Sequence, residues 1–303
     1  MSTLFPLFLE NIFPIIAVAG VGFLIQRLFN IDPRPLSVLI FYALTPALIF
    51  QLLLQSQFTS SDIIRMSGLA ALVVIILSLL SLGIGRLLKL SSASTAALLL
   101  TVGFMNSGNY GLSLNNYALG KIGLAWASLY FITTALLNNS LGVFIASMGK
   151  KDFRQSLRGM LRVPTLYAIV FAFILRFVDI SIPTSLLKPI ESMASATIPA
   201  MLLVLGMQIS RAGVPENKSL VGIATFLRLV ISPLLAWALT LFLGLPEIGA
   251  QAGILEASMP APVLAIIISM EFDTEPDFVS AVVLITTILS PLTLTPILAI
   301  LGL

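Results

Sequence analysis

Long apolar segments alternate with short polar connections along the whole chain. A helix needs about 20 apolar residues to cross the hydrocarbon core of a membrane. The segments that meet this requirement cover residues 5–28, 35–56, 63–88, 93–118, 122–148, 160–179, 186–210, 218–243, 248–271 and 277–301. The pattern therefore predicts an all-α integral membrane protein with ten transmembrane helices.

The second half of the chain repeats features of the first half at a nearly constant offset. The matching prolines are Pro14 with Pro164, Pro33 with Pro183 and Pro46 with Pro199. Prolines carry weight in so apolar a chain because each one constrains its helix. An odd number of spans in each half requires the halves to face opposite ways, as in many secondary transporters. We expect two inverted five-helix repeats, over residues 1–150 and 151–303.

Composition places the chain in the membrane and excludes several function classes. Hydrophobic residues make up 58% of the sequence and charged residues 10%, whereas soluble domains carry about 25% charged residues. The chain has no Cys and no His, so most hydrolytic constellations are unavailable. We expect no enzymatic activity, no bound cofactor and no nucleic-acid partner.

The distribution of basic residues predicts an orientation. If the basic loop 148–162 is cytoplasmic, eleven Lys and Arg residues fall on its side of the membrane and four on the other. This bias predicts that both termini lie outside the cytoplasm. We expect the protein to be integral to the plasma (bacterial inner) membrane. No basic segment precedes residues 5–28, so we interpret them as a retained span and not as a cleaved signal peptide.

The fourth and ninth predicted spans contain residues that interrupt helices. The fourth includes GFMNSGNYGLSLNN (103–116), which is rich in Gly and Asn. The ninth includes EASMPAPVLA (256–265), in which Pro260 and Pro262 cannot donate backbone hydrogen bonds. Both are expected to unwind near the middle of the membrane. Unwound backbone at that depth is tolerated when it is buried or lines a polar cavity, although simple kinks used for packing are the alternative.

Two broken helices that meet in the membrane offer positive N-terminal ends, which suit an anion, and free carbonyls, which suit a cation. We expect Asn106 and Asn109 to donate hydrogen bonds to a substrate carboxylate. The candidate substrate-binding residues are Asn106, Ser107, Gly108, Asn109, Tyr110, Gly111, Met259, Pro260, Ala261 and Pro262.

Glu256 is the candidate coupling residue. A charged carboxylate at the centre of a membrane helix costs about 3 kcal/mol, so this side chain is protonated, binds a cation such as Na⁺, or pairs with Arg228 in the eighth span. Thr133 and Thr134 are candidate oxygen ligands for the same cation. They are equally suited to hydrogen bonds between helices.

Several segments resemble a known family. NSGNYGLSL (106–114) and ASMPAPVLA (257–265) resemble the fourth-span and ninth-span signatures of the auxin efflux carrier family, which includes bacterial malate and malonate permeases and the plant PIN auxin carriers. TPALIF, LLVLGMQIS and RLVISPLLA are similar to further family segments. The chain departs from the family at Ser113, where a proline is usual. Glu256 and Met259 also match the spacing of a Na⁺-binding glutamate and a methionine in the distantly related bile acid/sodium symporters.

The resemblance implies an architecture and a site. It implies a scaffold of spans 1, 2, 6 and 7, a moving transport unit of spans 3–5 and 8–10, and homodimers that form through the scaffold. The substrate would bind where spans 4 and 9 cross. We therefore expect a secondary transporter of a small organic anion that works by an elevator-type movement, with Na⁺ or H⁺ as a possible coupling ion. A membrane ligand sensor without transport and a passive channel are the alternatives.

Overall fold

The structure is a computed structural model that describes residues 4–147, 163–178, 182–210 and 218–303. The regular elements in these ranges are all helical. In the first half they are α1 (Leu4–Leu7), η1 (Phe8–Ile12), α2 (Phe13–Phe29), α3 (Arg34–Leu39), η2 (Ile40–Leu44), α4 (Thr45–Gln55), α5 (Ser60–Leu87), α6 (Ser92–Gly103), η3 (Ser107–Leu112), α7 (Ser113–Leu137), η4 (Asn138–Gly142) and α8 (Val143–Ala146). In the second half they are α10 (Pro164–Phe177), α11 (Thr184–Ile209), α12 (Lys218–Phe226), η5 (Leu227–Ile231), α13 (Ser232–Leu243), α14 (Glu247–Ala257), α15 (Leu264–Phe272) and α16 (Pro276–Ile300). The η elements are π-helical turns.

Within the described residues, seven segments are long and apolar enough to cross a membrane. One of them, Ser92–Ala146, has 55 residues, which at 1.5 Å per residue is far longer than one crossing. It holds the fourth and fifth predicted spans, and the chain turns between them at Gly120, where φ is +62°. The sixth predicted span is a shorter apolar helix, and the ninth is divided between α14 and α15. The basic loop 148–162 lies outside the described residues.

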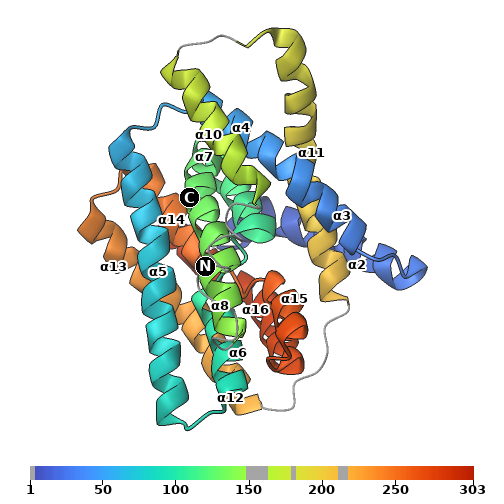
Figure 1. Cartoon of the computed structure of the whole chain (residues 1–303), viewed down its shortest axis with the longest axis vertical. Helices are drawn as coiled ribbons and strands as arrows, with labels where there is room; N and C mark the ends of the chain where they lie inside the picture. The colour runs from blue at the N-terminus through green and yellow to red at the C-terminus, as the bar shows by residue number, and fades with distance from the viewer. Residues whose placement is uncertain (1–3, 148–162, 179–181, 211–217) are drawn as a thin grey trace.

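The helices form two packing groups, which Figure 1 shows in different parts of the molecule. In the first group α2 packs along α11, and α4 packs against both α10 and α11. In the second group α7 packs against α5 and α14, and α5 also contacts α6 and α13. The elements of each group come from both halves of the chain. Each group therefore depends on contacts between segments that are far apart in sequence.

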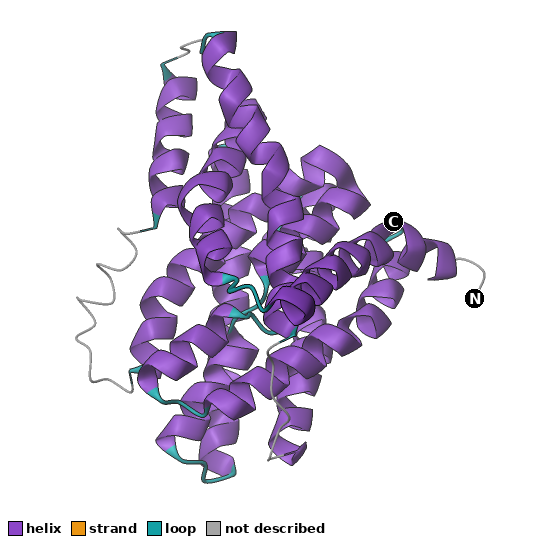
Figure 2. Cartoon of the chain, turned by 90° about the vertical axis from the view of Figure 1, so that its right-hand side faces the viewer, coloured by secondary structure: helices purple, strands orange, loops and turns teal. Residues whose placement is uncertain are grey.

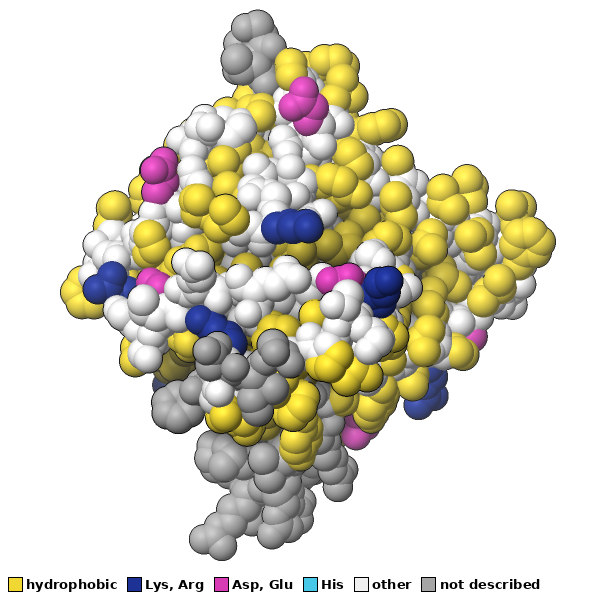
Figure 3. Space-filling model, turned by 90° about the horizontal axis from the view of Figure 1, so that it is seen from above, with side chains coloured by type: hydrophobic (Ala, Val, Ile, Leu, Met, Phe, Trp, Pro, Cys, Tyr) yellow, Lys and Arg dark blue, Asp and Glu magenta, His cyan; other side chains and the backbone are white. Residues whose placement is uncertain are grey.

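The outside of the molecule is apolar. Among the large exposed side chains are Phe242, Leu87 and Leu241, which expose 83%, 81% and 75% of their surface. In Figure 3 hydrophobic side chains cover much of the visible face, and the charged side chains are few and scattered. A soluble protein rarely exposes apolar surface on this scale. The surface therefore fits a lipid environment, in agreement with the composition.

Two interruptions lie in the middle of the helical bundle. The first comprises residues 104–106, between α6 and η3, and the second comprises residues 258–263, between α14 and α15. Figure 2 shows loops meeting in the centre of the molecule, away from its ends. The prediction that both segments unwind is confirmed.

Candidate functional site

The two interruptions are joined by a backbone hydrogen bond. The amide of Asn106 donates to the carbonyl oxygen of Pro260 over 2.9 Å. The carbonyl of Asn106 accepts in turn from the amide of Gly111 at 3.0 Å, which starts the π-turn η3. The interruptions of the fourth and ninth predicted spans therefore meet at one point.

A threonine from α16 supports the second interruption. Since Pro260 has no amide hydrogen, the helix cannot continue through it. The next amide, that of Ala261, donates to Oγ1 of Thr286 at 3.1 Å instead of to its own helix. The Thr286 hydroxyl is itself held by the carbonyl of Val282 at 2.6 Å. Thr286 thus replaces a hydrogen bond that the break removes.

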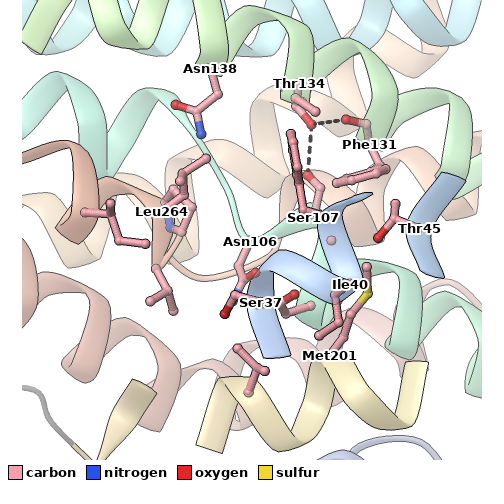
Figure 4. A pocket seen from close by; sticks show the side chains of 18 of the residues that line it. Ser37, Ile40, Thr45, Asn106, Ser107, Phe131, Thr134, Asn138, Met201 and Leu264 are labelled. Carbon is pink, nitrogen blue, oxygen red and sulfur yellow. Dashed lines mark hydrogen bonds between the residues drawn. The ribbon is translucent and has the colours of Figure 1, made fainter. Parts of the chain in front are cut away.

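We call the place where residues 104–106 and 258–263 meet the crossing. A cavity of about 360 Å³ lies beside it (Figure 4). One wall comes from α3, η2, α4 and α11, and the opposite wall comes from the interruptions and from α7, η4 and α15. Most lining side chains are apolar, including Phe104, Phe131 and Met201. Arg34 is the one charged residue among the described residues that line it. The cavity is therefore largely apolar and carries no acidic group on its described lining.

The structure divides the candidate substrate residues into two sets. Asn106, Ser107, Gly108, Asn109 and Pro262 line the cavity. The candidates that do not line it are Tyr110, Gly111, Met259, Pro260 and Ala261. The hydroxyl of Tyr110 instead accepts a hydrogen bond from the hydroxyl of Ser290 in α16 at 3.3 Å. The remaining residues of this set form the crossing itself or pack against Glu256.

Hydrogen-bond donors converge on the cavity. Both η3 and α15 begin here, so the amides of Ser107 and Leu264 have no acceptor one helical turn back. The next two amides of α15, of Ala265 and Ile266, donate to the carbonyls of Pro262 and Val263 at 3.0 Å. The Asn106 side chain is 5% exposed, and its Nδ2 has no partner among the described residues. The Ser107 hydroxyl accepts from Thr134 Oγ1 at 3.3 Å (Figure 4). This combination of helix N-termini and a free amide donor suits a bound anion.

Glu256 lies in the last turn of α14 and is fully buried. Its Oε1 accepts from Asn115 Nδ2 at 3.2 Å. The Ser107 side chain is also near the carboxyl group, but Oε2 has no hydrogen-bond partner of good geometry. A Cβ added at Gly111 would lie 2.6 Å from Oε1, so the carboxyl group fits only because residue 111 has no side chain.

The alternative in which Glu256 pairs with Arg228 is wrong. Arg228 is fully buried, and its guanidinium donates to the carbonyls of Val102 and Ala257 and to the Ser232 hydroxyl. The described residues contain no ion pair between it and Glu256. The reason is geometric, because the broken helices leave carbonyls that need donors, and Arg228 reaches them.

The two candidate threonines differ in position. Thr134 lines the cavity and contacts Ser107. Thr133 donates to the carbonyl of Leu129, one turn back in its own helix, and is absent from the described cavity lining. The structure therefore brings Thr134, but not Thr133, to the crossing.

Several polar residues of the site were not identified from the sequence. Ser37, Thr45, Thr165 and Gln208 line the cavity, and Thr286 supports the second interruption. Single Ser and Thr residues are common in membrane helices, so composition does not distinguish them. The π-turns η2 and η3 also rotate the following residues relative to a regular α-helix.

Comparison with known proteins gives a consistent result. The family described as membrane transport protein matches residues 7–155 and 148–298. A protein named "Uncharacterized transporter" from Methanothermobacter thermautotrophicus is 24% identical over 93% of this chain and 94% of its own length. A protein named "Putative malonate transporter" from Rhizobium meliloti is 25% identical over 95% of this chain and 93% of its own length. The chain thus belongs to the membrane transport protein family that includes the auxin efflux carriers, and it is a transporter and not an enzyme.

Proposed function

We propose that the protein is a secondary transporter of a small organic anion, which binds in the cavity beside the crossing. The observation that carries this proposal is the convergence of two helix N-termini and the unpaired Asn106 Nδ2 on a cavity whose described lining contains no acidic residue. Helix N-termini stabilise negative charge, and more strongly when water is excluded. Asn106 would donate to one carboxylate oxygen, and Asn109 on the next turn supplies a second amide.

The lining favours a carboxylate with an apolar or small body. Phe104, Met105 and Phe131 line the cavity together with the polar groups of the crossing. The single basic residue of the described lining, Arg34, belongs to the first turn of α3 and is exposed. A dicarboxylate would place one carboxylate at the crossing and the other towards Arg34. The relative named for malonate, a short dicarboxylate, is compatible with this arrangement.

We further propose ten transmembrane helices in two inverted repeats, over residues 1–150 and 151–303, with an elevator-type movement. The packing supports a division into a scaffold of α2, α4, α10 and α11 and a transport unit that contains the remaining long helices. The cavity lies between the two groups, as alternating access to a shared site requires. A homodimer through the scaffold belongs to the same proposal.

Glu256 is the proposed coupling residue. Its buried carboxyl group has one oxygen without a partner, and an uncompensated charge at this depth is costly. A proton or a Na⁺ ion would remove that cost, and its release would restore it. Because Ser107 lies near this carboxyl group and also lines the cavity, the state of Glu256 would affect anion binding.

Binding is tested on detergent-purified protein with malonate, malate, acetate and indole-3-acetate. A ligand that binds the folded state raises its melting temperature by mass action. We expect at least one carboxylate, but not the matching amide, to raise it. Uptake of the same acid into proteoliposomes separates transport from sensing. Stabilisation without uptake or exchange would favour a ligand sensor, and no response to any acid would remove the anion assignment.

A further inference from the structure

The breaks in the fourth and ninth spans leave a defined set of backbone carbonyls without their usual donors. The carbonyl of Val102 would accept from the amide of Asn106 in a continuous helix, but that amide donates to Pro260. The carbonyl of Ala257 would accept from the amide of Ala261, which donates to Thr286 instead. These carbonyls also form the negative C-terminal ends of α6 and α14.

One side chain reaches the free carbonyls of both interruptions. Nη1 of Arg228 donates to the carbonyl of Val102 at 2.9 Å and approaches that of Phe104 at 3.4 Å. Its Nη2 donates to the carbonyl of Ala257 and to the hydroxyl of Ser232. Ser232 in turn donates to the same Ala257 carbonyl at 2.7 Å. A single guanidinium therefore joins α6, α14 and α13.

Arg228 lies in this position without an acidic partner among the described residues. A buried charge is normally paired with an opposite charge, because its removal from water is costly. Here the compensating groups are backbone carbonyls and two helix C-termini, which is the environment that transporters of this kind use to hold a metal cation. Arginine remains charged in proteins and offers several fixed donors, so it meets the same electrostatic requirement from within the chain.

We propose that the guanidinium of Arg228 takes the place of a bound metal cation at the crossing. It holds the C-terminal ends of α6 and α14 together, and anion binding therefore needs no Na⁺ ion at their carbonyls. The inference rests on the proposed function for its second part, the anion site. Its first part, the electrostatic role, does not need a substrate. Arg228 is a positioning residue in this scheme, since it is absent from the described lining of the cavity.

The test is chemical rescue of Arg228→Ala. Guanidinium ion at millimolar concentration matches the charge and shape of the deleted group, and urea matches the shape without the charge. We expect the melting temperature of R228A to fall, and to rise again with guanidinium but not with urea. Arg176→Ala is the matched control. Arg176 contacts the carbonyl of Leu53 and the Ser56 hydroxyl in another part of the molecule, at 3.4 and 3.3 Å, so it should show no such rescue.

Anion binding gives the second readout, with the acid identified by the thermal-shift screen. In a Glu256→Gln background, which removes any cation site at that carboxyl group, we expect anion affinity to be the same in Na⁺ and in choline buffers. With Glu256 in place, we expect R228A affinity to be weaker than wild-type affinity by about tenfold or more until guanidinium is added. Equal rescue by urea, or full anion affinity in untreated R228A, would overturn the inference and leave the proposed function standing. A loss of affinity in choline buffer that persists in Glu256→Gln would also overturn it. Absence of anion binding by the wild type would instead refute the proposed function, while the rescue of stability would still decide the role of Arg228.

A second pair of variants covers the case in which R228A does not fold. Arg228→Lys keeps a positive charge, and Arg228→Gln keeps hydrogen-bonding capacity without charge. The inference requires R228K to be the more stable of the two. Equal stability, or greater stability of R228Q, would show that the site needs a hydrogen-bond donor and not a cation.

Discussion

The backbone amide of Asn106 donates a hydrogen bond of 2.9 Å to the carbonyl of Pro260, and so joins two interrupted helices from opposite halves of the chain. Around this bond the partly positive N-terminal ends and the partly negative C-terminal ends of the broken helices have different neighbours. The N-terminal ends, with Ser107 and Leu264, face the cavity. The C-terminal ends face Arg228.

Replacing Asn106 with Asp should weaken anion binding by about tenfold or more, because a donor would become an acceptor with a negative charge beside the bound carboxylate. Asn106→Ala should have a smaller effect of the same sign. The measurement is the shift in melting temperature against ligand concentration. Asn116→Asp is the control, since Asn116 does not line the cavity, and equal losses in both Asp variants would argue against a specific contact.

Glu256→Gln should abolish uptake driven by an imposed Na⁺ or H⁺ gradient while leaving the protein folded, because Gln has nearly the same shape but neither binds a proton nor offers a negative charge to Na⁺. Uptake into proteoliposomes under each gradient separately would identify the ion. Glu247→Gln, at the exposed first turn of the same helix, provides the control. Wild-type gradient dependence in E256Q would end the coupling role.

Gly111→Ala should destabilise the protein by about 1–3 kcal/mol, since the added Cβ would lie 2.6 Å from Oε1 of Glu256. A large part of this effect should disappear when Glu256 is replaced by Ala in the same chain, because the clash involves its carboxyl group. The control is Gly222→Ala, where no neighbour lies within 4 Å of the new Cβ. Denaturation of the wild type, G111A, E256A and the double variant gives the coupling free energy, and an additive result would contradict the close contact.

Both termini should lie on the non-cytoplasmic side of the membrane. Alkaline phosphatase fused after Leu303 should then be active, and green fluorescent protein at the same position should not fluoresce. A fusion within residues 148–162 should give the opposite pattern of activity. Fluorescence at the C-terminus would reverse the proposed orientation while leaving the number of spans unaffected.

The sequence predicted those parts of the site whose residues interrupt the backbone hydrogen bonds of a helix. Pro260, Pro262 and the Gly- and Asn-rich segment near Asn106 can be recognised in any helix, because their effects are local. The position of Glu256 beside the second break follows from the same proline. The interruptions and the burial of this carboxyl group were therefore accessible without a structure.

The partners of the broken segments were not accessible in the same way. Thr286 supports Ala261 from a helix that lies 25 residues further along, and Arg228 binds carbonyls more than 120 residues away. Such contacts depend on how helices are placed and rotated. Arg228 lies in the π-turn η5, where the hydrogen bonds span five residues and not four. The side chains of this turn therefore point in other directions than they would in a regular α-helix. A sequence pattern based on a regular helix cannot locate them.

The walls of the cavity come from both packing groups, and this has a pharmacological consequence. Tyr42 lies on the wall formed with η2, and Asn139 lies on the wall formed with η4. In the proposed elevator-type movement, a substrate that touches only the crossing would travel with it. A longer molecule that also contacts Tyr42 would bridge both groups and hold them in one position. Extending a substrate towards that wall should therefore convert it into a blocker that binds but is not carried.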